Sequence, residues 1–320
     1  MPAAVQLVCA LVSAVCAGVM GIALVPFLEH MRLYEPERAE EKKQDGAGER
    51  VRPVMGGLLG VVGTLAGLAA GFALYCRISG ADRTALSFQE TARGMLLCFL
   101  LGLTGALGGF LLDLRDVRRF VQKSGLRLRE PCLMFLVSLG FQMLLHAPDT
   151  LLTLGTRSVE AGAAALPVRA ALMALLWWGI AHFEDGTDGA SIGAGCVQLL
   201  VLAVLFLQGS TGMYALLMLS AAGGCLGTMV WNLPPARCRL GHTGHHWLGA
   251  LLSGSVMLQS DLRVALLIGA VYAVGALPRL WRRAPMTLMG AMERAGLTPF
   301  QRIALTAGFA AFSGSLLLLP

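Results

Sequence analysis

Long apolar segments recur along the whole chain, and they constrain its fold more than any other feature. A helix needs about 20 apolar residues to cross a bilayer. Of the 320 residues, 56% are hydrophobic and 14% are charged, against about 25% charged in soluble domains. A soluble fold could not bury this much apolar surface, so we predict an all-α, polytopic integral membrane protein with about ten transmembrane helices. The ten segments are residues 4–28, 53–76, 92–112, 131–147, 166–182, 190–208, 212–231, 246–260, 262–279 and 301–319.

The basic residues predict the orientation of these helices. With the N-terminus outside, the inside loops are residues 29–52, 113–130, 183–189, 232–245 and 279–302, and they hold 19 of the 25 lysines and arginines. This asymmetry follows the positive-inside rule. The net charge of +6 is then explained by topology and by attraction to anionic lipid headgroups. No soluble basic domain is present, so we expect no nucleic-acid partner.

The chain reads as one membrane domain over residues 1–320. The loop at residues 29–52 is charged, contains glycine and is poor in apolar residues, so we expect it to be a mobile cytoplasmic loop. The apolar run from Ala3 to Leu28 is too long for a signal-peptide core and lacks a basic start, so we expect a retained helix.

Residues 182–189 (HFEDGTDG) place three carboxylates and a histidine between two apolar segments. Charge at the end of a membrane span is costly and usually functional. A glycine follows both Asp185 and Asp188, and glycine lets the backbone approach a ligand closely. Paired carboxylates can hold a cation or move a proton. We therefore predict a site at Asp185 and Asp188; the alternative is that these aspartates cap the following helix.

Four further polar motifs fall on the same predicted cytoplasmic face. They are residues 53–57 (PVMGG), 109–116 (GFLLDLRD), 232–237 (NLPPAR) and 240–246 (LGHTGHH). Because the topology was assigned from charge and not from these motifs, their gathering on one face indicates one shared cytoplasmic site.

The five motifs, in this order and at these spans, resemble those of the polyprenyl-phosphate sugar-1-phosphate transferases, glycosyltransferase family 4. The resemblance is strongest to the phospho-N-acetylmuramoyl-pentapeptide transferase branch, and it covers nearly the whole chain. It implies a ten-helix enzyme of the bacterial cytoplasmic membrane, surrounded by membrane lipids, that transfers a phospho-sugar from a UDP-sugar to undecaprenyl phosphate and releases UMP. The products serve cell-wall (peptidoglycan) or surface-glycan synthesis. A homodimer is also implied.

The resemblance also implies the site. It assigns the catalytic role to Asp113, Asp185 and Asp188, and substrate binding to Gly56, Gly57, Asp116 and Asn232. It implies Mg²⁺ at the cytoplasmic face, which would neutralise charge on the pyrophosphate. The metal ligands are predicted to be Asp185, His182 and His242.

This sequence departs from the family pattern at the site. The family's Asp-Asp pair is Leu112-Asp113, its asparagine is His182, and a metal-binding aspartate is His242. The family's triple-histidine element is absent. Imidazole suits zinc better than magnesium, so Mn²⁺, Zn²⁺ or no metal are alternatives.

Several of these residues also have structural interpretations. Gly56 and Gly57 could serve close helix packing, Asn232 precedes a proline pair that stops a helix, and Asp113 could belong to a solvated helix end. The second functional hypothesis is therefore a catalytically silent paralogue that binds lipid phosphate or a cell-wall partner.

Overall fold

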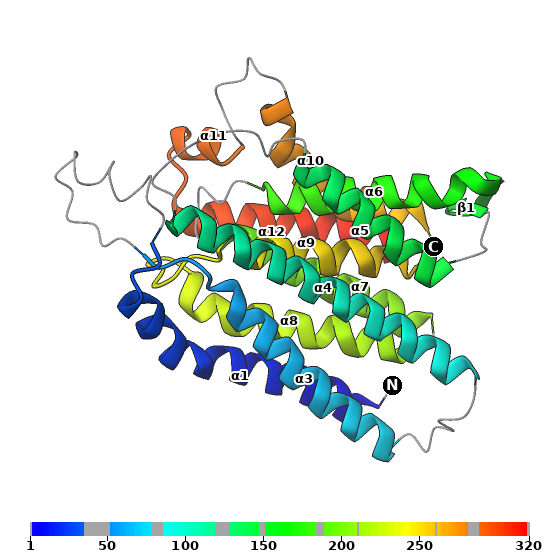
Figure 1. Cartoon of the computed structure of the whole chain (residues 1–320), viewed down its shortest axis with the longest axis horizontal. Helices are drawn as coiled ribbons and strands as arrows, with labels where there is room; N and C mark the ends of the chain where they lie inside the picture. The colour runs from blue at the N-terminus through cyan, green and yellow to red at the C-terminus, as the bar shows by residue number, and fades with distance from the viewer. Residues whose placement is uncertain are drawn as a thin grey trace.

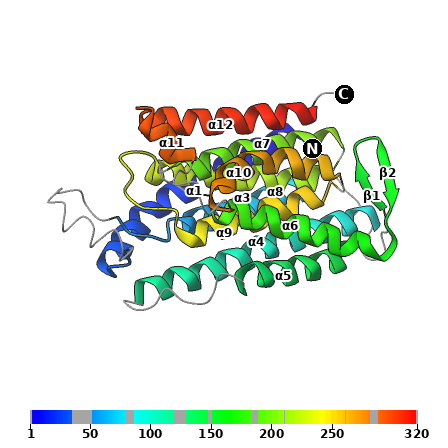
Figure 2. The same cartoon turned by 90° about the horizontal axis from the view of Figure 1, so that it is seen from above.

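The computed structural model describes residues 2–34, 52–78, 86–118, 129–146, 151–183, 189–209, 211–259, 261–280 and 288–318. This part of the chain forms a bundle of roughly aligned helices (Figures 1 and 2). A helix occupies each of the ten predicted segments, which confirms the helical fold class. These helices are α1 (Ala3–His30), α3 (Gly57–Ile78), α4 (Leu86–Arg118), α5 (Arg129–His146), α6 (Ala165–Ala181), α7 (Ala190–Gln208), α8 (Gly212–Asn232), α9 (Gly241–Met257), α10 (Leu262–Leu280) and α12 (Pro299–Ser315).

Six helical segments of the described chain are long and apolar enough to cross a membrane. They are Ala3–His30, Gly57–Ile78, Leu86–Arg115, Gly162–Ala181, Ala190–Gln208 and Gly212–Asn232. Two more, Glu130–Leu145 and Leu262–Gly275, are apolar but shorter. The chain is therefore a helical, multi-pass membrane protein, while the count of ten spans stays a prediction.

Helix α1 shows how the apolar segments divide between protein and surroundings. Its buried face carries small and medium side chains every third or fourth residue, and contacts α3 and α8. The opposite face exposes large apolar side chains at the same spacing: Leu7, Leu11, Val15, Val19 and Ile22. Such a continuous exposed stripe is unfavourable in water and suits a bilayer.

A short β hairpin between α5 and α6 departs from the purely helical expectation. Strand β1 (Leu151–Leu154) pairs antiparallel with β2 (Arg157–Glu160), at the end of the bundle that also holds both termini (Figure 2). The connection needs positive φ, supplied by Gly155 at +66°. The Gly155 amide donates to Asp261 Oδ1 over 3.1 Å. The hairpin is thereby attached to the turn between α9 and α10.

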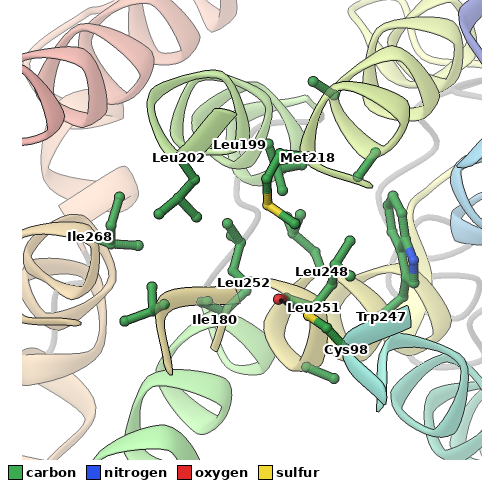
Figure 3. Close-up of a cluster of buried hydrophobic side chains, with 14 of the residues drawn as sticks. Cys98, Ile180, Leu199, Leu202, Met218, Trp247, Leu248, Leu251, Leu252 and Ile268 are labelled. Carbon is green, nitrogen blue, oxygen red and sulfur yellow. Dashed lines mark hydrogen bonds between the residues drawn. The ribbon is translucent and has the colours of Figure 1, made fainter. Parts of the chain in front are cut away.

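Helix α9 lies at the centre of the bundle. Figure 3 shows Trp247, Leu248, Leu251 and Leu252 of α9 surrounded by side chains from five other helices. These neighbours include Cys98 of α4, Ile180 of α6, Leu199 and Leu202 of α7, Met218 of α8 and Ile268 of α10. Because α9 is enclosed by protein, a shift of its position would disturb all of its neighbours.

Glycines allow α4 and α9 to touch through their backbones. A Cβ added at Gly105 would meet the His246 carbonyl oxygen at 2.4 Å, and one at Gly109 would meet the His242 carbonyl oxygen at 2.3 Å. The four-residue spacing places both glycines on one face of α4. This Gly-x-x-x-Gly stripe is the small-residue pattern of close helix packing in membranes.

The remaining described elements are short. They are the 3₁₀ turns η1 (Gly162–Ala164) and η2 (Leu316–Leu318), and helix α11 (Leu288–Arg294). Helix α12 begins with a capping box between Thr298 and Gln301, and Pro299 occupies its first turn.

Candidate functional site

The five polar motifs meet at one end of the bundle, opposite the termini. Here α1, α4, α6 and α8 end and α7, α9 and α12 begin (Figure 1). The prediction that the motifs share one place is therefore confirmed for their described residues. Residues 184–188, which include Asp185 and Asp188, lie outside the described residues, as does most of the predicted mobile loop at residues 29–52.

The segment before α3 is fastened to the segment before α9. The amides of Gly56 and Gly57 donate to the carbonyl oxygens of Arg239 and Leu240 over 2.8 and 2.9 Å. A Cβ on Gly57 would meet Gly244 Cα at 2.1 Å. Both amides are used within the protein, so the geometry favours the packing role of these glycines over the predicted contact with substrate.

Asp113 reaches from the last turns of α4 to the first turn of α9. Its Oδ1 accepts from the His242 amide over 2.9 Å, and its Oδ2 accepts from the Thr243 amide and hydroxyl over 2.9 and 2.6 Å. The residue is 3% exposed, so it does not belong to a solvated helix end. Because of this cap, α9 begins at Gly241, five residues before the predicted span, and the first-turn histidines are helical.

A carboxylate that the motif analysis missed joins two of the histidines. His182, which follows α6, and His246 of α9 each place Nε2 3.5 Å from the same Oε1 of Glu130, the second residue of α5. The Nδ1 of His182 donates to the Trp178 carbonyl over 3.1 Å, and the Trp178 ring stacks on His182 with centroids 4.9 Å apart. The stack and the hydrogen bond aim Nε2 at Glu130. The sequence feature that could have identified Glu130 is its position as a carboxylate at the edge of a predicted span.

The charge balance at Glu130 favours its ionised form. Burial by itself raises the pKa of Glu130, but the hydrogen-bonding contact with His182 and the electrostatic influence of the His182, His246 and His242 imidazoles outweigh it. The pKa therefore lies below its ordinary value of 4.5. Glu130 stands one residue before the predicted fourth span, and its side chain is 21% exposed.

We expect Glu130→Gln to destabilise the protein by about 1 kcal/mol, because the charged partner of two imidazoles is lost. Since the folded-state pKa is lowered, this stabilisation is present above pH 4.5 and is lost as the pH falls through the lowered pKa. Thermal unfolding of both proteins in detergent, from pH 7 down to about pH 3, measures it. The exposed Glu90→Gln is the control, and identical melting of Glu130→Gln and wild type at neutral pH would contradict the assignment.

Asn232 ends α8 beside the site and is 1% exposed. Its Nδ2 donates to the Cys238 carbonyl over 3.1 Å, which closes the turn after α8. Its Oδ1 has no hydrogen-bond partner among the described residues. Nearby, a Cβ on Gly189 would approach Leu233 and Ile303, so the end of α8 and the start of α12 flank the point where α7 begins.

Arg302 on α12 is a second residue that the motifs did not single out. It is buried, and its Nη1 lies 3.2 Å from Glu293 Oε2 of α11. This ion pair joins α11 to α12 beside the start of α7. Asp116 lies on α4 near the same end of the bundle, although its side chain is outside the described part.

The described residues do not form a magnesium site. None of their histidine, cysteine, aspartate and glutamate side chains gather in a group of three that could hold a metal ion. The oxygens of Asp113 accept three hydrogen bonds from α9, and imidazoles are poor ligands for magnesium. His182 contacts Glu130, while the ring of His242 lies 6.2 Å from that of His246. The predicted ligand Asp185 lies outside the described residues.

Together, the fold and this end of the bundle define a helical membrane protein. Its polar motifs are distant in sequence, and hydrogen bonds join them at one site. Comparison with known proteins identifies its family. A model of glycosyl transferase family 4 matches residues 94–260. The chain belongs to glycosyl transferase family 4.

Relatives align over most of the chain. The phospho-N-acetylmuramoyl-pentapeptide-transferase of Synechococcus sp. (strain CC9605) is 30% identical over 288 residues, which cover 83% of this chain and 74% of that protein. The protein of the same name from Saccharopolyspora erythraea is 28% identical and covers 83% and 80%. That from Mycobacterium tuberculosis (strain ATCC 25177 / H37Ra) is 27% identical and covers 82% and 79%.

Proposed function

We propose that this protein is a glycosyl-1-phosphate transferase of cell-wall synthesis, which moves a phospho-sugar from a UDP-sugar to undecaprenyl phosphate. The observation that carries the proposal is the meeting of the family's motifs at one end of the bundle, in a chain that belongs to glycosyl transferase family 4. The names of the relatives support this reaction class.

The reaction transfers the sugar-bearing phosphoryl group from the UDP-sugar to the acceptor phosphate. An oxygen of the acceptor phosphate forms a bond to the sugar-bearing phosphorus of the donor. The bond from that phosphorus to the bridging oxygen breaks, and UMP leaves with the electron pair. Catalysis of such a transfer is mainly positioning and charge stabilisation. We assign to Asp185 and Asp188 the positioning of the acceptor phosphate and the acceptance of its proton. No step is assigned to a metal ion, because the described residues do not fit magnesium.

We further propose the topology that this reaction needs. Ten transmembrane helices with an outside N-terminus would put the site on the cytoplasmic face of a bacterial membrane, where UDP-sugars are present. The presence of a helix in each of the ten predicted segments and the bias of basic residues toward the predicted inside loops support it. The homodimer remains a prediction.

The silent paralogue is the second candidate, and the imidazole-rich site favours it. Histidines stand where the family pattern has asparagine and aspartate, and Glu130 is engaged with two of the site's histidines. Such a protein would still bind lipid phosphate but would not turn over.

A direct assay separates the two. Purified protein is incubated with undecaprenyl phosphate, UDP-sugars and magnesium, manganese or zinc, and UMP release is followed. Bound metal is measured in wild type, His242→Ala and His245→Ala. UMP release supports the transferase; no UMP with any metal, together with retained binding of undecaprenyl phosphate, favours the silent paralogue. Absence of stoichiometric metal in wild type would refute a histidine-bound metal.

A further inference from the structure

We propose that Asp113 is a positioning residue that caps helix α9 from a neighbouring helix, and that it affects the reaction only through α9. The cap rests on geometry alone, while its effect on transfer rests on the proposed function. The proposal replaces the predicted catalytic role of Asp113.

Helix α9 cannot cap itself. The first amides of any helix lack partners within that helix, and side-chain oxygens of Ser, Thr, Asp or Asn normally accept from them. The residue before α9 is Leu240, which has no such oxygen, and no side-chain cap occurs there. Asp113, 130 residues away in sequence, accepts from Thr243 instead.

Hydrogen bonds from α9 occupy most of the acceptor sites of the Asp113 carboxylate. An ionised aspartate has about four lone-pair sites, and three donors already occupy Asp113: the amides of His242 and Thr243 and the hydroxyl of Thr243. The negative charge also suits the positive end of the α9 dipole. A metal ion or an acceptor proton would have to displace these donors from a buried group.

The backbone around the cap is built to fit it. Gly241 adopts φ +71°, and a Cβ there would meet Asp113 Oδ2 and the Met55 amide nitrogen at 2.8 Å each. Gly105, Gly109 and Asp113 follow one another at four-residue spacing on the face of α4 that contacts α9. The glycines permit the approach of the helices, and Asp113 fixes their register.

The cap determines where the histidines of α9 are held. His242 and His246 are one turn apart on α9, and His246 meets Glu130. If the cap is removed, the first turn of α9 frays and His246 is no longer held against Glu130. Asp113 thereby sets the geometry of this wall of the site without contacting substrate.

Two variants and a conservative control test this proposal. Asp113→Asn turns one acceptor into a donor, Thr243→Val removes the hydroxyl donor at constant shape, and Thr243→Ser retains that donor. Hydrogen exchange of the full-length protein in detergent is followed at the amides of residues 242–246. We expect exchange to be about tenfold faster or more in Asp113→Asn and Thr243→Val, and unchanged in Thr243→Ser.

Kinetics of UMP release distinguish positioning from catalysis. We expect kcat to fall in both Asp113→Asn and Thr243→Val, and the double variant to be no slower than Asp113→Asn, because both changes break one contact. For whichever of magnesium, manganese or zinc supports UMP release, the concentration that gives the half-maximal rate should stay within about twofold of wild type, since Asp113 is not a ligand.

Unchanged amide protection in Asp113→Asn would overturn the proposal. A raised metal-ion requirement in Asp113→Asn, combined with full activity of Thr243→Val, would also overturn the proposal. That result would identify Asp113 as a ligand of the metal ion. If the wild type releases no UMP, the proposed function fails, while the exchange measurement still decides whether Asp113 caps α9.

Discussion

Gly109→Ala should destabilise the protein strongly, whereas Gly108→Ala on the same helix should not. A Cβ added at Gly109 would lie 2.3 Å from the His242 carbonyl oxygen and 2.7 Å from Thr243 Cα. These are backbone atoms at the capped start of α9, so no flexible side chain can move aside. We expect a loss on the order of 3 kcal/mol, which is about 10 °C in the melting temperature.

Gly108 is the matched control because a Cβ there meets nothing within 4 Å. Alanine is also the better helix former, so Gly108→Ala is expected to be neutral or to stabilise by up to about 1 kcal/mol. Thermal unfolding of both variants in the same detergent measures the difference. Equal melting temperatures would show that α4 and α9 are not in backbone contact.

Asp185→Asn should abolish UMP release, with a loss of at least about 100-fold. Asparagine keeps the shape of the side chain but removes the carboxylate that the proposed site would use to accept a proton from the acceptor phosphate or to hold a divalent cation. The initial rate of UMP release at saturating donor and acceptor measures it.

The control for this variant is Glu160→Gln, an exposed carboxylate on β2 at the opposite end of the bundle. It should retain the wild-type rate. Binding of undecaprenyl phosphate should persist in both variants, which separates lost chemistry from lost folding. Undiminished activity in Asp185→Asn would mean that the catalytic assignment is wrong.

Much of this fold is predictable because its helices follow from local sequence. The apolar segments predicted ten positions, each of which holds a helix. The positive-inside rule, together with the ordered motifs, predicted that the polar motifs gather at one end. The segment from Pro53 to Gly57 and the segment from Gly241 to Gly244 do lie together. Apolar segments and motifs can be recognised in the sequence because each consists of residues that are close together in the chain.

The roles of individual polar residues were less predictable, because they depend on partners distant in sequence. The motif predicts a catalytic role for Asp113, whereas its hydrogen bond with Thr243 supports the positioning role that we propose, and nothing in the local sequence distinguishes the two roles. Glu130 belongs to no motif, and its contacts with His182 and His246 form only where α5 meets the end of α6 and α9. The β hairpin was missed for a similar reason: its anchor, Asp261, comes from another turn.

The most direct test of the central claim is detection of both products of transfer. The purified wild-type protein is given undecaprenyl phosphate and a set of UDP-sugars, and the lipid fraction and UMP are quantified by mass spectrometry. We expect undecaprenyl diphosphate-sugar and UMP in equal amounts, and neither from Asp185→Asn. Bound undecaprenyl phosphate without either product, whatever metal is supplied, would contradict this expectation.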